Sequence, residues 1–148
     1  MPFLPRRSIR NSDVFYSHLL SSASSRTPLV TLWTASWCPT CKVVEPLVRD
    51  IVASGVGEAE GGVAFCTVEY DAPDIMTGGL GMQYMITSLP SLLSFDAQEA
   101  QTQTKVVDGR QLADRAFVEA WIRNEALRQG GRGGGESASL FGGLFGRR

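Results

Sequence analysis

Two cysteines three residues apart, Cys38 and Cys41, have the spacing in this chain that is most suited to chemistry. A C-x-x-C pair either closes a disulfide or directs both sulfurs at one ligand, so it indicates redox chemistry or metal binding. Structural zinc requires four nitrogen or sulfur ligands. The sequence adds only the isolated Cys66 and His18, with no second C-x-x-C and no pair of histidines at zinc-ligand spacing. Redox chemistry is therefore the favoured interpretation. Two incidental cysteines at the start of a helix are the remaining alternative.

A buried strand and a helix are predicted on either side of the pair. Residues 28–33 are mostly apolar and β-prone, as in a strand covered on both faces. Cys38 then falls at a helix N-terminus, where free N–H groups and the helix dipole favour a thiolate. Pro39 removes one such N–H but has the fixed φ that suits the first helical position. The helix is predicted over 40–53 from one apolar stripe: Val43, Val44, Leu47, Val48, Ile51 and Val52.

The other segments predict further helices and strands. A helix begins at Asn11 and carries His18, which is expected at the surface. A strand over 63–70 contains Cys66, as an inert buried thiol or, alternatively, a regulatory one. Residues 71–85 predict a loop with a short interrupted helix, 90–95 a strand, 105–107 an edge strand and 112–127 a helix. The apolar residues expected on the core faces of the first and last helices are Val14, Phe15, Leu19, Leu20, Leu112, Ala116, Val118, Trp121, Ile122, Ala126 and Leu127.

Two segments of the sequence resemble the thioredoxin family. Trp37-Cys38-Pro39-Thr40-Cys41-Lys42, with Pro46 five residues after the second cysteine, is similar to its active-site segment. Ile-Thr-Ser-Leu-Pro-Ser-Leu-Leu-Ser-Phe at 86–95 resembles the cis-proline loop and the following strand. The two segments stand in the family's order at about its separation, and the resemblance covers roughly residues 11–128. It implies a single thioredoxin-like α/β domain with a central mixed β-sheet flanked by helices.

That resemblance also implies a thiol–disulfide oxidoreductase. Cys38 would attack a substrate disulfide, and Cys41 would resolve the mixed disulfide. In the family, the loop with the cis bond lies beside the cysteines and pairs with an extended substrate peptide. No bound cofactor is expected, because the two cysteine sulfurs of the domain themselves carry the electrons that are exchanged. The expected partners are disulfide-containing proteins and a dithiol or NADPH-linked reductase. The residues expected to contact substrate are Trp37, Pro39, Leu89 and Pro90.

The sequence departs from the family's pattern at the residues that assist deprotonation of the resolving cysteine, Cys41. The family usually has a buried aspartate six residues before the first cysteine, where this chain has Leu32, and an accompanying lysine near the position of Thr67. Glu45 lies one helical turn after Cys41 on the same face and is a candidate proton acceptor for that thiol; a solvated helix residue is the alternative. The departures leave a rival function open, a binding or adaptor module with little or no turnover.

Length and composition are those of one ordinary globular domain. The 148 residues suffice for a single core. A net charge of -1 gives no reason to expect a nucleic-acid partner. No apolar run approaches the roughly 18 residues of a membrane span, so no membrane partner is expected, and we expect a monomer. Three cysteines are too few for a disulfide-stapled secreted domain, which favours a cytoplasmic location.

The two ends of the chain differ in composition from the middle. Residues 1–10 include Arg6, Arg7 and Arg10 and are expected to be a flexible basic terminus before a domain at 11–128. A mitochondrial presequence is the alternative interpretation. Residues 129–148 are rich in glycine and are predicted to be a disordered tail. Leu-Phe-Gly occurs twice in this tail, at Leu140 and Leu144, either as a docking peptide or without specific function.

Overall fold

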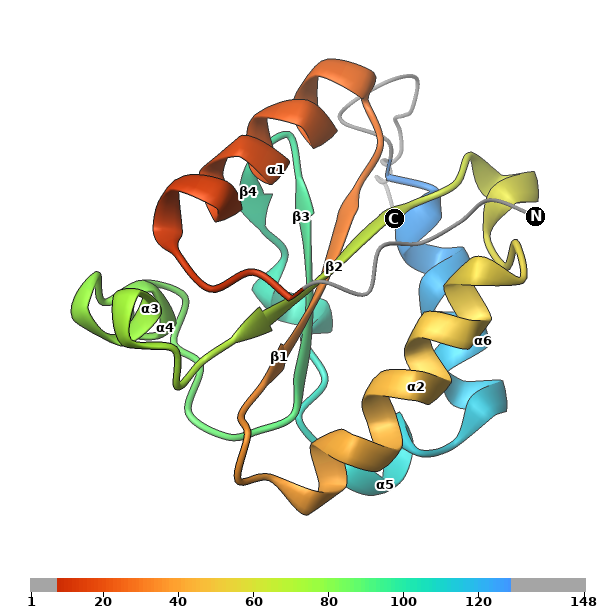
Figure 1. The fold of residues 1–148 in the computed structure, drawn as a ribbon. Coiled ribbons are helices and arrows are strands. Elements are labelled where there is room, and N and C mark those ends of the chain that lie inside the picture. Colours follow the sequence, from red (N-terminus) through yellow and green to blue (C-terminus); the bar gives the residue numbers. More distant parts are fainter. Residues whose placement is uncertain (1–7, 129–148) are drawn as a thin grey trace.

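A four-stranded mixed sheet forms the centre of the computed structural model, which describes residues 8–128 (Figure 1). The strands are β1 (Leu29–Thr34), β2 (Ala64–Glu69), β3 (Ser91–Asp96) and β4 (Glu99–Ala100), in the order β2-β1-β3-β4. β2 runs parallel to β1, whereas β3 is antiparallel to β1 and β4 is antiparallel to β3. The predicted α/β fold with a central mixed sheet is confirmed.

The central strand β1 lies between two hydrophobic layers, and all six of its residues are buried. Trp33 belongs to one layer, where its ring centroid lies 5.7 Å from that of Phe15, and Leu32 belongs to the other. Thr31 is also buried, and its hydroxyl donates to the Leu93 carbonyl at 2.7 Å and accepts from Trp33 Nε1 at 2.8 Å. Because these polar atoms are paired, β1 is buried without an unsatisfied side chain.

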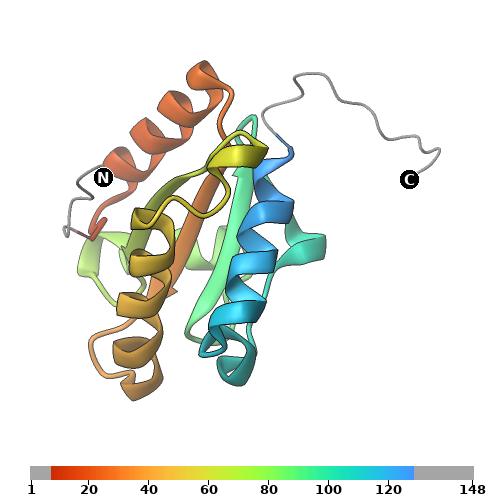
Figure 2. The ribbon, with the colours of Figure 1, turned by 90° about the vertical axis from the view of Figure 1, so that its right-hand side faces the viewer.

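Helices cover both faces of the sheet, as Figures 1 and 2 show. On one face lie α1 (Ser12–Ser25), α3 (Pro73–Thr77) and α4 (Leu80–Gln83). On the other lie α2 (Pro39–Ala53), α5 (Gly109–Leu112) and α6 (Arg115–Ala126), with α2 and α6 side by side (Figure 2). Short 3₁₀ turns occur at Glu58–Glu60 and Thr102–Thr104. Within residues 8–128, none of the helices has the length and apolar character needed to cross a membrane.

Several helical side chains that were predicted to face the core are exposed. The buried stripes are narrower than the sequence periodicity suggests, because each helix contacts the sheet along one line of residues. In α1, for example, only Phe15, Leu19 and Ser22 are buried. The predicted core residues that flank such stripes and are exposed are Val14, Leu20, Val43, Ala116 and Leu127.

The segments after β3 also differ from the prediction. The helix expected over 112–127 is interrupted at Asp114, whose Oδ1 accepts a hydrogen bond from the backbone N–H of Ala116 at 3.0 Å. This cap starts α6 as a separate helix after the single turn of α5. The edge strand expected over 105–107 is reduced to one bridge between Val106 and Leu92, which follows the 3₁₀ turn at Thr102–Thr104.

Residues 8–10 are part of the packed domain, which corrects the prediction of a flexible segment through Arg10. Ile9 is buried; its N–H donates to the Thr67 carbonyl at 2.8 Å, and its carbonyl accepts from the Glu69 N–H at 2.9 Å. Arg10 forms an ion pair with Glu69. The remaining residues of the two predicted termini, 1–7 and 129–148, lie outside the described residues.

Candidate active site

The cysteine pair lies at the junction of β1 and α2. β1 ends at Thr34 and α2 begins at Pro39, so the pair follows the carboxyl end of the central strand. Cys38 is the N-cap residue, and its Sγ accepts a hydrogen bond from the backbone N–H of Cys41 at 3.1 Å. The two sulfurs form a disulfide, with Cα atoms 5.3 Å apart. Such a pair can take up or release two electrons.

Both cysteines are almost completely buried, although their neighbours in the motif are exposed. Cys38 is 4% exposed and Cys41 is 2% exposed, and Leu89 packs against the cluster that they form with Ala35. Trp37, in contrast, is 67% exposed, and Pro39 is also exposed. A molecule that approaches the sulfurs therefore passes over Trp37, Pro39 and Leu89.

The loop before β3 brings a distant part of the chain to the cysteines. Leu89 is half-buried against them, whereas Pro90, next to it, is buried. The Leu89–Pro90 peptide bond is cis. Ser91 Oγ donates a hydrogen bond to the Ser88 carbonyl at 2.6 Å, which fixes the loop on the strand that follows. Of the four residues predicted to contact substrate, Trp37 and Pro39 are the exposed neighbours of Cys38 in sequence and Leu89 packs against the cysteine cluster. Pro90 is buried next to Leu89.

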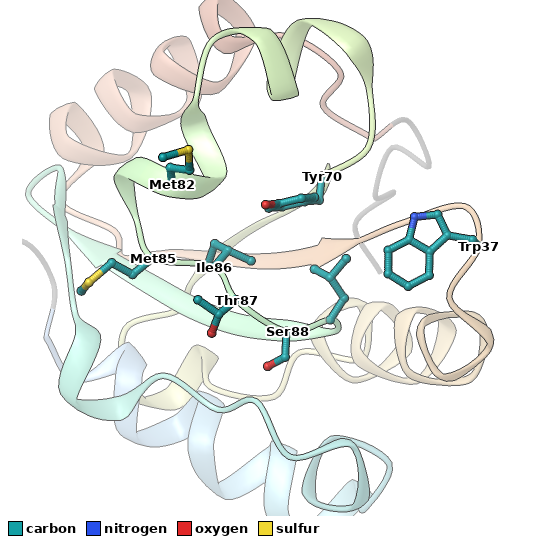
Figure 3. Close-up of a pocket in the computed structure, with 8 residues that line it drawn as sticks. Trp37, Tyr70, Met82, Met85, Ile86, Thr87 and Ser88 are labelled. Atoms are coloured by element: carbon teal, nitrogen blue, oxygen red, sulfur yellow. The ribbon is translucent and has the colours of Figure 1, made fainter.

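An apolar groove of about 600 Å³ begins at Trp37, beside the disulfide, and follows the loop before β3 (Figure 3). Figure 3 shows Trp37 at one end and Met85 at the other, with Tyr70 and Met82 along one side. Thr87 and Ser88 contribute its polar lining. The groove has the shape and chemistry to hold an extended, largely apolar segment. Its apolar lining consists of Trp37, Tyr70, Met82, Met85, Ile86 and Leu89.

A second and more polar pocket, of about 210 Å³, is lined by Cys41 and not by Cys38. Glu45 and Glu69 also line it. Glu45 Oε2 accepts a hydrogen bond from Arg49 Nη2 at 3.1 Å. The volume is sufficient for several water molecules. Cys41 therefore borders a pocket with two carboxylates, and this pocket shares no lining residue with the apolar groove.

A carboxylate that the sequence analysis did not single out holds the turn that presents Trp37. Asp71 follows β2 and accepts hydrogen bonds from the Ser36 hydroxyl at 2.6 Å and the Ser36 N–H at 3.2 Å. The hydrogen bond from the Ser36 hydroxyl is the main cause that lowers the pKa of Asp71. A signal for this contact was present, because residues just beyond the carboxyl ends of two adjacent parallel strands meet at one edge of a sheet.

A family model for thioredoxin matches residues 8–120 of the chain. The chain belongs to the thioredoxin family. A comparison with curated proteins finds no match.

Solved thioredoxin structures have a similar fold. Thioredoxin NaTrxh from Nicotiana alata is 20% identical, with a TM-score of 0.63, over 85% of this chain and 98% of that one. The thioredoxin of Malassezia sympodialis is 21% identical, with a TM-score of 0.60, over 85% and 97% of the two chains. Fasciola hepatica thioredoxin is 16% identical, with a TM-score of 0.60, over 80% of this chain and 99% of that one. At these identities the likeness establishes the fold.

The thioredoxin-family position of a buried aspartate is filled by Leu32, which is fully buried among apolar side chains beneath α2. Thr67, at the position of the accompanying lysine, pairs with the Ser8 hydroxyl at 2.7 Å. The carboxylates that border Cys41 therefore come from α2 and from the end of β2, and not from β1.

The side of the groove formed by Tyr70, Met82 and Met85 was not predicted from the sequence. Tyr70, Met82 and Met85 come from the end of β2, from α4 and from the loop after it. No local pattern marks them as neighbours of the cysteines, since they meet only in the folded chain. The one available signal was at Ile86, which starts the segment that resembles the cis-proline loop.

The two other candidate residues lie away from the disulfide. Cys66 is buried inside β2, where burial raises the pKa of its thiol to about 12, and this favours the inert over the regulatory alternative. His18 is exposed on α1, and its Nδ1 lies 3.0 Å from the Val14 carbonyl oxygen. In the part of the chain that the structure describes, no three His, Cys, Asp or Glu side chains are grouped to hold a metal ion.

Proposed function

We propose that this member of the thioredoxin family is a thiol–disulfide oxidoreductase that reduces or exchanges disulfides in proteins. The observation that carries the proposal is the bonded Cys38–Cys41 pair at the start of α2, with the Cys41 N–H 3.1 Å from Cys38 Sγ. This hydrogen bond and the helix N-terminus stabilise a thiolate more than a thiol, because the acceptor then carries a full charge. Cys38 is therefore the nucleophile of the reduced protein.

The reaction proceeds in two displacements. The Cys38 thiolate attacks one sulfur of the substrate disulfide, forms a mixed disulfide and releases the other substrate sulfur as a thiolate. The Cys41 thiolate then attacks Cys38 Sγ, which forms the Cys38–Cys41 disulfide and releases the second substrate sulfur. Two electrons pass to the substrate, so a dithiol or NADPH-linked reductase must return two electrons to the pair.

Cys41 must lose its proton before the second displacement. Glu45 is the proposed acceptor, because both residues line the polar pocket and Glu45 follows Cys41 by one helical turn. The proton passes to the carboxylate directly or through pocket water. In this arrangement the proton leaves on the side of the polar pocket, while the substrate occupies the apolar groove on the other side.

The substrate is proposed to be an extended protein segment that contains the disulfide. The loop of Thr87, Ser88 and Leu89 lies along the groove and supplies backbone groups for pairing with such a segment. Trp37 supplies an exposed aromatic face beside the disulfide. Binding through backbone pairing and apolar contact tolerates many sequences, which suits a protein that acts on several substrates.

Turnover on a model protein disulfide, measured with the reduction potential of the pair, tests the proposal. Cys38→Ser should abolish turnover. Cys41→Ser should instead accumulate a covalent mixed disulfide through Cys38, detectable by intact-protein mass spectrometry. Cys66→Ala is the matched control, because it removes a buried cysteine away from the site and should retain turnover. A wild-type pair that oxidises but does not turn over any protein disulfide contradicts the proposal.

A binding module of the thioredoxin fold is the second candidate function. The observation that favours it is Leu32, because an apolar side chain at the position of the family's buried acid supplies no acid–base group to Cys41. In that case the groove holds a partner and the cysteine pair is not turned over. Partner binding that is unchanged in Cys38→Ser, together with no turnover in the wild type, would identify this function.

A further inference from the structure

The apolar groove is open to solvent within residues 8–128. Met82 is 81% exposed and Met85 is 62% exposed, and with the exposed Trp37 they line it from end to end. Exposed apolar side chains that gather along one groove mark a place where another segment binds. Methionine side chains are flexible and polarisable and make favourable contacts with aromatic rings. The groove is therefore suited to an apolar segment that contains aromatic residues.

The sequence contains such a segment outside the described residues. Residues 140–148 are Leu-Phe-Gly-Gly-Leu-Phe-Gly-Arg-Arg. Residues 129–139, in contrast, contain no large apolar side chain. The chain thus carries two Leu-Phe pairs, at 140–141 and at 144–145, after a glycine-rich connection.

The end of α6 is linked to the Met85 end of the groove by two adjacent contacts. Arg128 Nη2 lies 3.5 Å from Thr104 Oγ1, and Lys105 Nζ donates to the Met85 carbonyl at 2.9 Å. Because Thr104 and Lys105 are neighbours, ordinary bond lengths put the Arg128 Cα within roughly 26 Å of that carbonyl. Leu140 follows Arg128 by 12 positions. A glycine-rich connection of this length spans about 20 Å on average and about 40 Å when extended, so Leu140 can reach the groove.

Charge favours one direction for the segment in the groove. Asp71 is bound to Ser36, the neighbour of Trp37 in sequence, and like any aspartate of ordinary or lowered pKa it is charged at neutral pH. Arg147 and Arg148 follow the second Leu-Phe pair. A segment that enters at Met85 with its first Leu-Phe pair therefore brings its two arginines toward Asp71.

We propose that residues 140–148 bind in the apolar groove of their own molecule, with Phe141 beside Met85 and Phe145 toward Trp37, and compete there with substrate. Tethering gives the segment a local concentration on the order of 1 mM, so an intrinsic dissociation constant of that size leaves the groove about half occupied. Substrates must then displace the segment before they reach Cys38. The competition rests on the proposed oxidoreductase function, whereas the docking itself does not.

The docking is tested in the full chain labelled with methyl-¹³C methionine. The chain has four methionines. Met82 and Met85 line the groove, while Met76 is similarly exposed outside its lining and serves as the internal reference. Phe141→Ser combined with Phe145→Ser should shift the Met82 and Met85 methyl signals and leave the Met76 signal unchanged, because the ring currents of the two phenylalanines are lost.

Two results overturn the docking proposal. One is that the Met82 and Met85 methyl signals have the same positions in the wild type as in the double phenylalanine variant. The other is a signal difference that grows with protein concentration, because it would assign the bound segment to a second copy of the chain. The matched control is Ser137→Ala with Ser139→Ala, which changes the same part of the sequence and should shift none of the signals. A concentration-independent shift confined to Met82 and Met85 supports the proposal.

Turnover gives the readout for competition. If the segment occupies the groove for 50 to 90% of the time, the double phenylalanine variant should show a KM for a protein disulfide that is about two- to tenfold lower, with kcat unchanged. An unchanged KM overturns the competition. Absence of turnover in every variant is instead a failure of the proposed oxidoreductase function, and the methyl signals then still decide the docking.

Discussion

Replacement of Glu45 by glutamine should slow resolution of the mixed disulfide and leave its formation unchanged. Glu45 lines the polar pocket with Cys41, whereas Cys38 does not line it. A thiol with the ordinary pKa of about 8.5 is only about 3% ionised at pH 7, so a carboxylate that accepts its proton can accelerate attack by up to about 30-fold. Glutamine has similar size but accepts no proton. We expect resolution to slow by about 10- to 30-fold at pH 7.

The assay is a single turnover followed by stopped flow. Reduced protein is mixed with one equivalent of an aromatic disulfide whose thiolate is coloured. The first thiolate released reports attack by Cys38, and the second reports attack by Cys41 on the mixed disulfide. Cys41→Ser should therefore lose the second phase completely. The effect of Glu45→Gln should be smaller at pH 9.5 than at pH 7, because a larger fraction of the thiol ionises without help as the pH rises.

Glu69→Gln is the matched control, because Glu69 lines the same pocket but comes from β2. It should change the second phase by less than twofold. The fold should tolerate Glu45→Gln, since the lost pair with Arg49 is an i,i+4 helix pair worth about 0.3–0.5 kcal/mol. A second phase with the wild-type rate in Glu45→Gln at pH 7, or an equal slowing at pH 7 and pH 9.5, would refute the role of Glu45 as proton acceptor.

Three further predictions concern stability. Asp71 has a lowered folded pKa, mainly through the Ser36 hydroxyl, so its stabilisation is complete above its unfolded pKa of about 3.9 and is lost as the pH falls through the folded value. The Tm difference between wild type and Asp71→Asn should thus be present at pH 7 and vanish in acid. Leu32→Asp should lower the free energy of unfolding in urea by about 4 kcal/mol or more, since it leaves a cavity and an unpaired buried carboxylate. Leu32→Met should cost less than about 1.5 kcal/mol, and similar costs for the two variants would contradict the argument. Thr31→Val should lower the free energy of unfolding by about 1–3 kcal/mol without changing turnover, because Trp33 Nε1 loses its buried acceptor.

The cysteine pair and its surroundings could be predicted from sequence because their signals are local. The apolar run before Trp33 and the helical spacing after Cys38 lie within a few residues of each other. They fix a strand, a turn and a helix in order, and the helix start then fixes the place of the thiol. The Asn11 cap was predictable for the same reason, and its Oδ1 accepts from the Val14 N–H at 2.9 Å.

The groove could not be predicted in this way because it is built from segments that meet only in the folded chain. Met82 lies in α4 and Met85 in the loop after it, and their position in the same groove as Trp37 depends on the path of the chain between β2 and β3. The exposure of Val43 has a similar origin. Periodicity identifies an apolar side of a helix, but the width of the buried stripe depends on how closely the helix approaches the sheet.

The contact between residues 8–10 and β2 has a consequence for processing of the chain. β2 is the outermost strand of the sheet, and unpaired edges of outer strands recruit other chains and promote aggregation. The backbone of Ile9 pairs with this edge at Thr67 and Glu69, and Arg10 adds a charge beside it. Removal of a ten-residue presequence would expose the edge and favour self-association. We therefore expect a chain that begins after Arg10 to self-associate more readily than a chain that begins before Ser8.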